Sequence, residues 1–200
     1  MLFSVSHVNL WNFCPGDFQM ELTKEYIAEQ EDCIKRNYDV HISWGNNPHI
    51  RERYMTLKEF CQSAKKILSV GCAGVEPWAI GATHACDVSR VAYELLKKNN
   101  WQGQFFISSC DNIGADDKEF DVAVCSEVIE HLPDLETIKK TFSELDRVAK
   151  KWIVTTPCVD VKEPTHKFLF TEKQLRELTK DYPVQIIKKD IHFYIIKNDR

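Results

Sequence analysis

The chain has 200 residues, of which 44% are hydrophobic and 28% charged, and its formal net charge is −4. This length allows one globular domain with a substantial core, but hardly two. The acidic balance disfavours a broad nucleic-acid-binding surface, which is usually basic, although it leaves room for a small basic pocket. No apolar run approaches the ~18 residues of a membrane-spanning helix, so no membrane partner is expected.

Eight cysteines are scattered along the chain, and no two have a Cys-x-x-Cys spacing. Disulfide frameworks belong mainly to short secreted chains. The first nine residues also lack the basic start and the long apolar run of a signal peptide. We therefore expect buried free thiols and a cytoplasmic protein.

The first part of the chain differs from the rest, and we interpret residues 1–64 as a helical extension or lid that precedes a domain of residues 65–200. Apolar periodicity predicts helices over Met20–Arg36 and Ile50–Ala64, with a turn at residues 46–48 between them. Several aromatic residues of this part either close over a functional site or pack the helices onto the domain that follows. They are Trp11, Phe13, Phe18, Tyr26 and Trp44.

From Lys65 onward, short apolar strands alternate with helices. The predicted strands are residues 65–70, 83–86, 105–108, 120–125, 152–155, 184–188 and 192–196, and helices begin at Ser89, Asp134 and Thr171. Only three residues separate the last two strands, which therefore pair as a hairpin. The pattern predicts an α/β fold: a doubly wound, mostly parallel seven-stranded sheet with a C-terminal antiparallel hairpin and an N-terminal helical extension.

Ligands of such sheets bind beyond the carboxyl ends of the strands. The first strand ends in Gly71-Cys72-Ala73-Gly74, where small residues let the backbone turn tightly beside a ligand, although such a turn is also an ordinary strand-to-helix corner. The second strand ends at Asp87. Its carboxylate either accepts hydrogen bonds from the ribose hydroxyls of an adenine nucleotide or nucleoside, or stabilises the start of the next helix.

The segment after the fourth strand is more specific. Residues 120–132, Phe-Asp-Val-Ala-Val-Cys-Ser-Glu-Val-Ile-Glu-His-Leu, closely resemble a motif of class I (Rossmann-like) S-adenosylmethionine-dependent methyltransferases, especially the branch that includes the ubiquinone-biosynthesis O-methyltransferases. Four other segments are similar to further motifs of that family, in the same order: residues 67–74, 87–89, 152–157 and 166–178. The resemblance implies a methyltransferase that binds S-adenosylmethionine and releases S-adenosylhomocysteine.

The resemblance also implies which residues bind the cofactor. They are Gly71, Ala73 and Gly74 beneath the methionine part, Asp87 at the ribose, Asp111 or Asn112 at the adenine, and Ser126 and Glu127 between cofactor and acceptor.

Some positions depart from the family pattern. The family usually has an acidic residue where this chain has Ser69, and glycine where it has Ala73 and Val75. Ser69 has no charge to offer the amino group of the cofactor, so either binding is weaker or Glu76 substitutes. The stretch between Gly74 and Asp87 is also short, which predicts a stunted first crossover helix.

Methyl transfer from a sulfonium needs the nucleophile held close to the methyl group and in line with it, with water excluded. A general base helps when the nucleophile is a hydroxyl, and the candidates for this catalytic role are Glu130, His131 and His166. His131 is at least as well interpreted as a buried structural histidine. Cys158 is interpreted as structural because nothing nearby marks its thiol as activated. Residues 156–158, Thr-Pro-Cys, also differ from the signature of enzymes that methylate amino groups of nucleic-acid bases.

Three functions stay open. The favoured one is methyl transfer to an oxygen or nitrogen of a small-molecule acceptor, without a bound metal, with the acceptor selected by the long loop of residues 158–170 and the N-terminal segment. In the second, Glu127, Glu130 and His131 share a helical face and bind a divalent metal with His166. That pattern resembles the small-RNA 3′-terminal ribose 2′-O-methyltransferases. The third is a non-catalytic module, one that either binds S-adenosylmethionine or serves in an interaction. The oligomeric state is not predicted.

Overall fold

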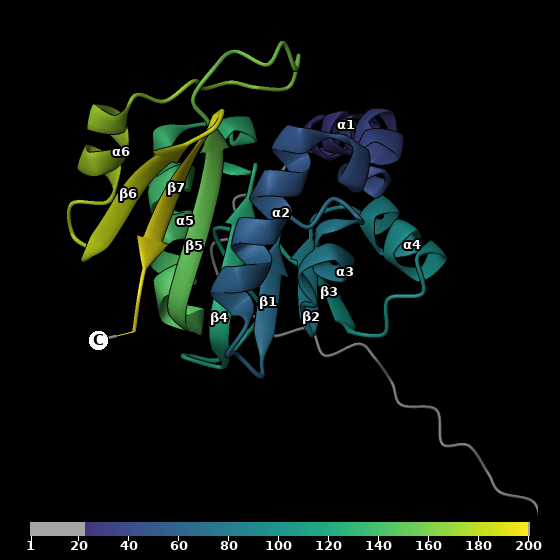
Figure 1. Cartoon of the computed structure of the whole chain (residues 1–200), viewed down its shortest axis with the longest axis horizontal. Coiled ribbons are helices and arrows are strands. Elements are labelled where there is room, and N and C mark those ends of the chain that lie inside the picture. Colours follow the sequence, from purple (N-terminus) through teal and green to yellow (C-terminus); the bar gives the residue numbers. More distant parts are fainter. Residues whose placement is uncertain (1–22, 200) are drawn as a thin grey trace, which may run out of the picture.

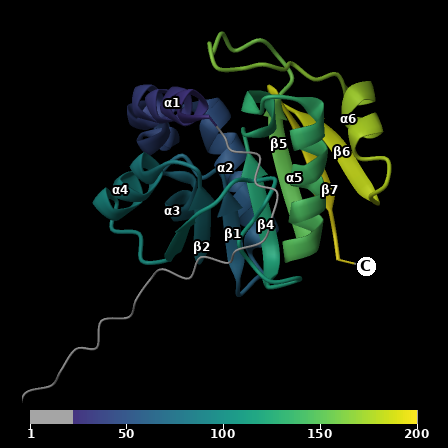
Figure 2. The same ribbon diagram turned by 180° about the vertical axis from the view of Figure 1, so that it is seen from behind.

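The computed structural model describes residues 23–199, which form a seven-stranded sheet covered by helices on both faces (Figures 1 and 2). In the order of the sheet, the strands are β3 (Gln104–Ile107), β2 (His84–Asp87), β1 (Ile67–Val70), β4 (Phe120–Ser126), β5 (Ala149–Pro157), β7 (His192–Lys197) and β6 (Val184–Lys189). The first five are parallel, whereas β7 is antiparallel to both β5 and β6. The predicted fold class, including the terminal hairpin, is confirmed.

The described residues form six α-helices, of which α1, α2 and α5 are the longest. The helices are α1 (Lys24–Ile42), α2 (Pro48–Cys61), α3 (Glu76–Ile80), α4 (Arg90–Lys98), α5 (Leu135–Val148) and α6 (Glu172–Leu178). Two 3₁₀ turns, η1 (Trp44–Asn46) and η2 (Ile129–His131), are also present. The first crossover helix, α3, has only 5 residues, as its short segment predicts. None of the described helices is long and apolar enough to cross a membrane.

Two hydrophobic layers enclose the sheet. On the face seen in Figure 1, α2 and α3 pack against β1, β4 and β7 through residues that include Leu57, Val122 and Tyr194. On the opposite face, seen in Figure 2, α5 covers β4 and β5 and α6 lies beside β6, and Phe142 and Trp152 are fully buried there. Because both faces are covered, the polar groups of the chain gather at the ends of the strands.

Local capping explains where several helices begin. Ser89 accepts a hydrogen bond from the Val91 N–H at the start of α4, and Thr171 forms a capping box with Gln174 at the start of α6. Both helix starts were predicted from the sequence. In these caps a side-chain oxygen satisfies a backbone N–H that has no partner inside the helix.

The boundaries of several elements differ from the sequence prediction, and α1 and β5 are two examples. Helix α1 was expected to end at Arg36, but it continues to Ile42 because Tyr38 is buried and its hydroxyl donates to Asn99 at the end of α4. Residues 20–22 of that predicted helix lie outside the described residues. Strand β5 was expected to begin at Trp152, but it begins at Ala149, which pairs with Phe120 of β4.

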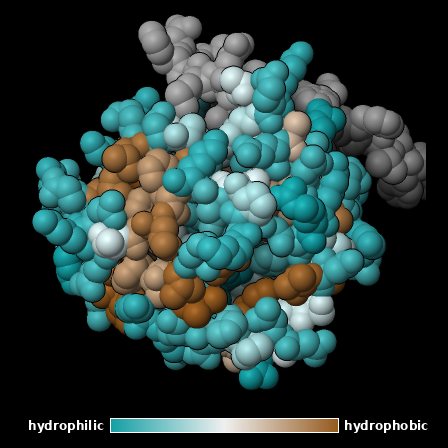
Figure 3. Space-filling model, turned by 90° about the horizontal axis from the view of Figure 1, so that it is seen from above, coloured by the Kyte–Doolittle hydropathy of each residue, from teal (hydrophilic) through white to brown (hydrophobic). Residues whose placement is uncertain are grey.

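The carboxyl ends of the parallel strands meet at one end of the molecule, where α1 also lies (Figure 1). Seen from this end, the surface is mostly hydrophilic, with hydrophobic side chains gathered toward the lower left of the view (Figure 3). The order of the strands reverses between the neighbours β1 and β4, because β2 and β3 follow on one side of β1, whereas β4 and β5 lie on the other. In open α/β sheets this switch is where ligands bind.

Candidate active site

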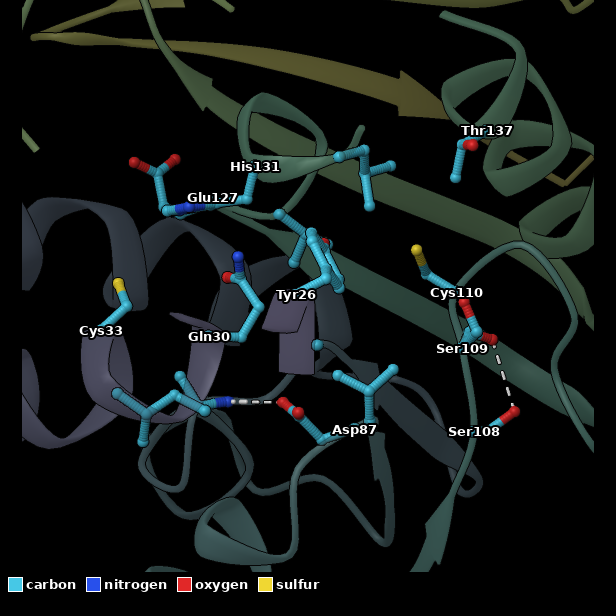
Figure 4. Close-up of a pocket in the computed structure, with 16 residues that line it drawn as sticks. Tyr26, Gln30, Cys33, Asp87, Ser108, Ser109, Cys110, Glu127, His131 and Thr137 are labelled. Atoms are coloured by element: carbon cyan, nitrogen blue, oxygen red, sulfur yellow. Dashed lines mark hydrogen bonds between the residues drawn. The ribbon is translucent and has the colours of Figure 1, made fainter. Parts of the chain in front are cut away.

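A cavity lies at the switch between β1 and β4, between the strand ends and α1. Figure 4 shows Tyr26 and Gln30 of α1 among the side chains that follow the strands. The lining residues are Tyr26, Gln30, Cys33, Ile34, Gly71, Ala73, Asp87, Val88, Ser108, Ser109, Cys110, Glu127, Val128, His131, Leu132 and Thr137.

Asp87 ends β2 and forms one wall of the cavity. Its Oδ2 accepts a hydrogen bond of 3.2 Å from the Ala73 N–H, and its Oδ1 accepts one of 2.9 Å from the Ser89 N–H (Figure 4 shows the first). The residue is only 6% exposed, and this burial raises the pKa of its carboxyl to about 6 in spite of those hydrogen bonds. The carboxylate therefore holds the turn after β1 against the start of α4, beside the cavity.

The turn after β1 passes under the cavity with a left-handed backbone. Gly71, Ala73 and Gly74 have φ values of 68°, 45° and 79°. A Cβ on Gly71 would lie 2.5 Å from Cγ2 of Val128, so only glycine fits where this turn approaches β4. Gly74 instead faces α4, where a Cβ would lie 2.7 Å from Cβ of Leu95, and it does not line the cavity.

A carboxyl group does lie beside Ser69, although Ser69 itself has no charge. The Ser69 hydroxyl is fully buried and donates a hydrogen bond of 2.7 Å to Oε1 of Glu76, at the start of α3. Glu76 is 4% exposed, and burial raises the pKa of its carboxyl to about 7. An acidic group is thus present near the end of β1, supplied from the following helix.

Glu127 follows β4 directly and forms the opposite wall of the cavity. Its carboxylate lies 3.1 Å from Nη1 of Arg53 and 3.4 Å from Nε2 of His192, and it accepts a hydrogen bond of 2.9 Å from Thr155. Burial opposes ionisation, but Arg53 and His192 hold the pKa of the Glu127 carboxyl below its usual value. Glu127 is therefore a fixed negative charge in the wall.

The three candidate catalytic residues lie together beside this wall. One potential ligand atom from each of Glu130, His131 and His166 lies within 4.8 Å of the other two. Glu130 is fully buried, its Oε2 accepts from Thr156, and its Oε1 has no hydrogen-bond partner among the described residues. Burial and the nearby Glu127 raise the pKa of the Glu130 carboxyl, whereas burial and His166 lower the pKa of His131 to about 4. At neutral pH, His131 is an uncharged imidazole.

The structure places the sequence-predicted site residues in two groups. Those that line the cavity are Gly71, Ala73, Asp87, Glu127 and His131; those that do not are Gly74, Asp111, Asn112, Ser126, Glu130 and His166. The Asp111 carboxylate accepts a hydrogen bond from Ser109, and Asn112 forms a backbone bridge with the same residue. The hydroxyl oxygens of Ser126 and Thr155 lie 2.9 Å apart inside the sheet, and because the Thr155 proton is donated to Glu127, Ser126 donates to Thr155.

The aromatic residues of the N-terminal part have different positions. Tyr26 lines the cavity, whereas Trp44 packs edge-on against Tyr54 at 5.7 Å between ring centroids. Trp11, Phe13 and Phe18 lie outside the described residues.

Sequence reasoning missed the residues that support the site from distant parts of the chain. They are Arg53 of α2, Thr165 of the loop after β5, and His192 at the start of β7, whereas Glu163 belongs to the loop that was expected to select the acceptor. The sequence offered one usable signal, for His192. Because β7 is antiparallel to β5, the first residue of β7 lies beside the last residue of β5. Arg53 gave no signal, since a charged residue in an amphipathic helix is normally exposed.

Residues 68–152 match the family model described as a methyltransferase domain. The match covers less than half of the chain and indicates that this part resembles a methyltransferase domain, a type that uses S-adenosylmethionine. The match does not identify the ubiquinone-biosynthesis branch. None of the curated proteins matches the sequence.

Solved methyltransferase structures share the fold at low sequence identity. The N-methyltransferase NodS from Bradyrhizobium japonicum, in complex with S-adenosylhomocysteine, is 14% identical with a TM-score of 0.66, over 86% of this chain and 98% of NodS. The Burkholderia thailandensis 1,6-didemethyltoxoflavin-N1-methyltransferase, with its acceptor and S-adenosylhomocysteine bound, is 15% identical with a TM-score of 0.62, over 92% and 94%. The methyltransferase domain of the bacterial CtHen1-CN protein is 20% identical with a TM-score of 0.55, over 74% and 98%.

The residues around the cavity fit the cofactor. Asp87 presents a buried carboxyl group that accepts hydrogen bonds, as ribose hydroxyls require, and the backbone at Gly71 leaves a cradle that a Cβ would fill. The carboxylate of Glu127 in the opposite wall suits the positive charges of a sulfonium and an amino group.

Proposed function

We propose that this methyltransferase transfers the methyl group of S-adenosylmethionine to an oxygen or nitrogen of a small-molecule acceptor. The observation that carries the proposal is the cavity itself, which has Asp87 at one wall, Glu127 and His131 at the other, and α1 over it. A site covered by a helix suits a small molecule better than a polymer, because the acceptor must share this space with the cofactor.

In this proposal each wall has a separate role. Asp87 holds the ribose, and the ionised Glu127, kept in place by Arg53 and His192, stabilises the positive charge of the bound cofactor. The cofactor supplies an electrophilic methyl group on a sulfonium. The walls hold the acceptor atom in line with that group and exclude water.

His131 is the general base in this proposal. It lines the cavity and is uncharged at neutral pH, so it can take the proton from an acceptor hydroxyl or amine. Glu130 is fully buried beneath it, and burial keeps its carboxyl protonated to a higher pH than usual. Glu130 and His166 therefore support the base rather than meet the acceptor.

Helix α1 is the lid of this site. It contributes Tyr26, Gln30, Cys33 and Ile34 to the cavity, and Glu31 accepts a hydrogen bond of 3.2 Å from Ser89 of the α4 cap. Since cofactor and acceptor reach the strand ends beneath this helix, we infer that residues 1–64 act as a lid on the domain formed by residues 65–200.

Calorimetric titration with S-adenosylhomocysteine tests the proposal, with Asp87→Asn and Asp111→Asn as a matched pair. Asp87→Asn should weaken binding roughly 10- to 100-fold, because a hydrogen bond to a charged group contributes about 1.5–3 kcal/mol. Asp111→Asn should bind nearly as the wild type does, because Asp111 does not line the cavity. Absence of binding to the wild-type protein would refute the enzyme proposal and favour a module without catalytic activity.

A metal-dependent RNA ribose methyltransferase is the second candidate, and one observation favours it. The unpartnered Oε1 of Glu130 lies 4.0 Å from Nε2 of His166, with His131 close by, which is a donor set that divalent metals accept. Glu127, the fourth expected ligand, is instead paired with Arg53 and His192. Titration with Mn²⁺ separates the candidates: saturable binding lost in Glu130→Gln, together with methylation of an RNA 3′ end, would replace the small-molecule proposal.

A further inference from the structure

The loop after β5 places a hydroxyl group between a carboxylate and the imidazole of His131. Oγ1 of Thr165 lies 2.9 Å from Nδ1 of His131 and 3.0 Å from Oε1 of Glu163. Thr165 is only 3% exposed, so water does not compete for these contacts. The three groups form a continuous hydrogen-bonded chain that ends at the cavity wall.

The direction of this chain follows from the proton inventory of its members. A threonine hydroxyl has one proton, and an ionised carboxylate has none to donate. Although burial opposes ionisation, hydrogen bonds from Asn37, Arg36 and Thr165 lower the pKa of Glu163 to about 2. Thr165 therefore donates to Glu163, and its oxygen accepts a proton from Nδ1 of His131.

Another acceptor near Thr165 is weaker. Sγ of Cys33 lies 3.4 Å from the same hydroxyl, but a thiol sulfur is a poorer acceptor than a carboxylate. The other ionisable groups that face His131 are Glu127, Glu130 and His166, whose ring meets that of His131 edge-on at 4.6 Å between centroids. None of these three is hydrogen-bonded to Nδ1 of His131 in the described part of the chain.

Helix α1 holds the far end of the chain. Nη2 of Arg36 donates to Oε1 of Glu163 at 2.9 Å, and Nδ2 of Asn37 donates to Oε2 at 3.1 Å. Both donors belong to the helix that covers the cavity. The position of α1 is therefore linked to the orientation of the Glu163 carboxylate.

We propose that Glu163 and Thr165 are positioning residues that fix His131 as its Nδ1–H tautomer, and that α1 completes this arrangement when it closes over the cavity. The inference rests on the proposed function, in which His131 takes the acceptor proton. With Nδ1 occupied, the lone pair is on Nε2, the nitrogen left for the cavity. The base is then ready only while the lid is in place, which limits proton abstraction to the covered site.

Nitrogen-15 NMR of protein labelled at histidine tests the tautomer without knowledge of the acceptor. Long-range proton–nitrogen correlation spectra distinguish a protonated ring nitrogen from a bare one, and His131→Gln assigns the signals. In the wild-type protein at neutral pH, we expect Nδ1 of His131 to be protonated and Nε2 bare. A wild-type spectrum with the proton on Nε2 would overturn the proposal.

Variants then test each link of the chain. Thr165→Val should lose the Nδ1–H signature of His131, and Thr165→Ser should restore it. Glu163→Gln and the pair Arg36→Ala with Asn37→Ala should shift the populations toward the Nε2–H form. Thr179→Val is the matched control, because Thr179 is equally buried but donates to the Leu175 carbonyl in α6.

The results also separate this inference from the proposed function. An unchanged tautomer in Thr165→Val would refute the positioning role, even if S-adenosylhomocysteine still binds. Failure to bind S-adenosylhomocysteine, with the Nδ1–H signature intact, would refute the proposed function instead. If Thr165→Val does not fold, the wild-type spectrum and Thr165→Ser still decide the question.

Discussion

Several residues around the cavity have a left-handed backbone. Besides the three in the turn after β1, Glu127 has a φ of 57°, and such a conformation costs an ordinary residue about 1–2 kcal/mol. At Glu127 the conformation is held by the ion pair with Arg53 and the hydrogen bond from Thr155. The strained backbone and the fixed negative charge thus occur at the same position.

Gly74 provides a test of the packing in this turn. Gly74→Ala adds a Cβ 2.7 Å from that of Leu95, at a φ of 79°. We expect a loss of about 2–4 kcal/mol in the free energy of unfolding, measured by urea denaturation. Gly45→Ala is the control, since a Cβ there meets nothing within 4 Å. Equal stability of the two variants would contradict the described position of α4.

Glu76 gives a pH-dependent prediction. Its carboxyl pKa is about 7 in the folded protein against 4.5 for the ordinary group, because it is buried. The folded state keeps this proton where the unfolded state releases it, so the residue lowers wild-type stability as the pH rises through that interval. Glu76→Gln removes this loss and keeps an oxygen for the Ser69 hydroxyl.

Relative to the wild type, Glu76→Gln should gain up to about 3 kcal/mol between pH 4.5 and pH 8. Urea denaturation across that range measures the difference. The variant Glu94→Gln serves as the control, because Glu94 is exposed. A stability difference that does not vary with pH would show that Glu76 titrates normally.

The sequence predicts residues of the site where a strand ends in a recognisable pattern. Asp87 and Glu127 belong to this class, and both line the cavity. Arg53 and His192 do not, because their roles arise only when α2 and β7 pack beside β4. Such contacts depend on tertiary structure and leave no local pattern in the chain.

At the scale of elements, α1 is held over the cavity by polar contacts that include those with both ends of α4 and with the loop after β5. Among them are Glu31 with Ser89, Arg36 and Asn37 with Glu163, and Tyr38 with Asn99. Most of its residues are exposed or half-buried. A helix with such limited burial can move as a unit at modest energetic cost.

Substitutions in two helix caps distinguish an effect on stability from an effect on binding. Ser89→Ala and Thr171→Ala each remove an N-cap hydrogen bond, and each should lower the free energy of unfolding by about 1 kcal/mol. Only Ser89 also contacts α1, through Glu31. Ser89→Ala should therefore also change the affinity for S-adenosylhomocysteine in calorimetry, whereas Thr171→Ala should not. If the two substitutions have an equal effect on binding, the contact between Ser89 and Glu31 does not help to hold α1 over the site.

Element boundaries were the less predictable part of the fold. The caps at Ser89 and Thr171 are local signals and were predicted correctly. The start of β5 was not, because the charged residues Lys150 and Lys151 do not fit the pattern of an apolar strand, although the pairing with β4 begins at Ala149. Tertiary hydrogen bonds override the local pattern there.

At the scale of the whole molecule, alternation of strands and helices was sufficient to predict the sheet, because parallel strands need crossovers of fixed hand. The same sheet brings the carboxyl ends of the parallel strands to one side, so one helix can cover the site. Hydrogen exchange measures how that helix responds to a ligand. With S-adenosylhomocysteine bound, exchange should slow in residues 24–42, while α6, outside the cavity, should be unchanged. Uniform slowing throughout the chain would argue against a lid.

The distribution of thiols gives the fold a further property. Five of the seven described cysteines are buried, and burial raises the pKa of all five, so these sulfurs resist alkylation and oxidation. Cys33 is half-buried in the wall that α1 contributes to the cavity, although burial raises the pKa of its thiol as well. We expect a thiol reagent to modify Cys33 faster when α1 moves away from the cavity, so the rate of modification would report the motion of this helix.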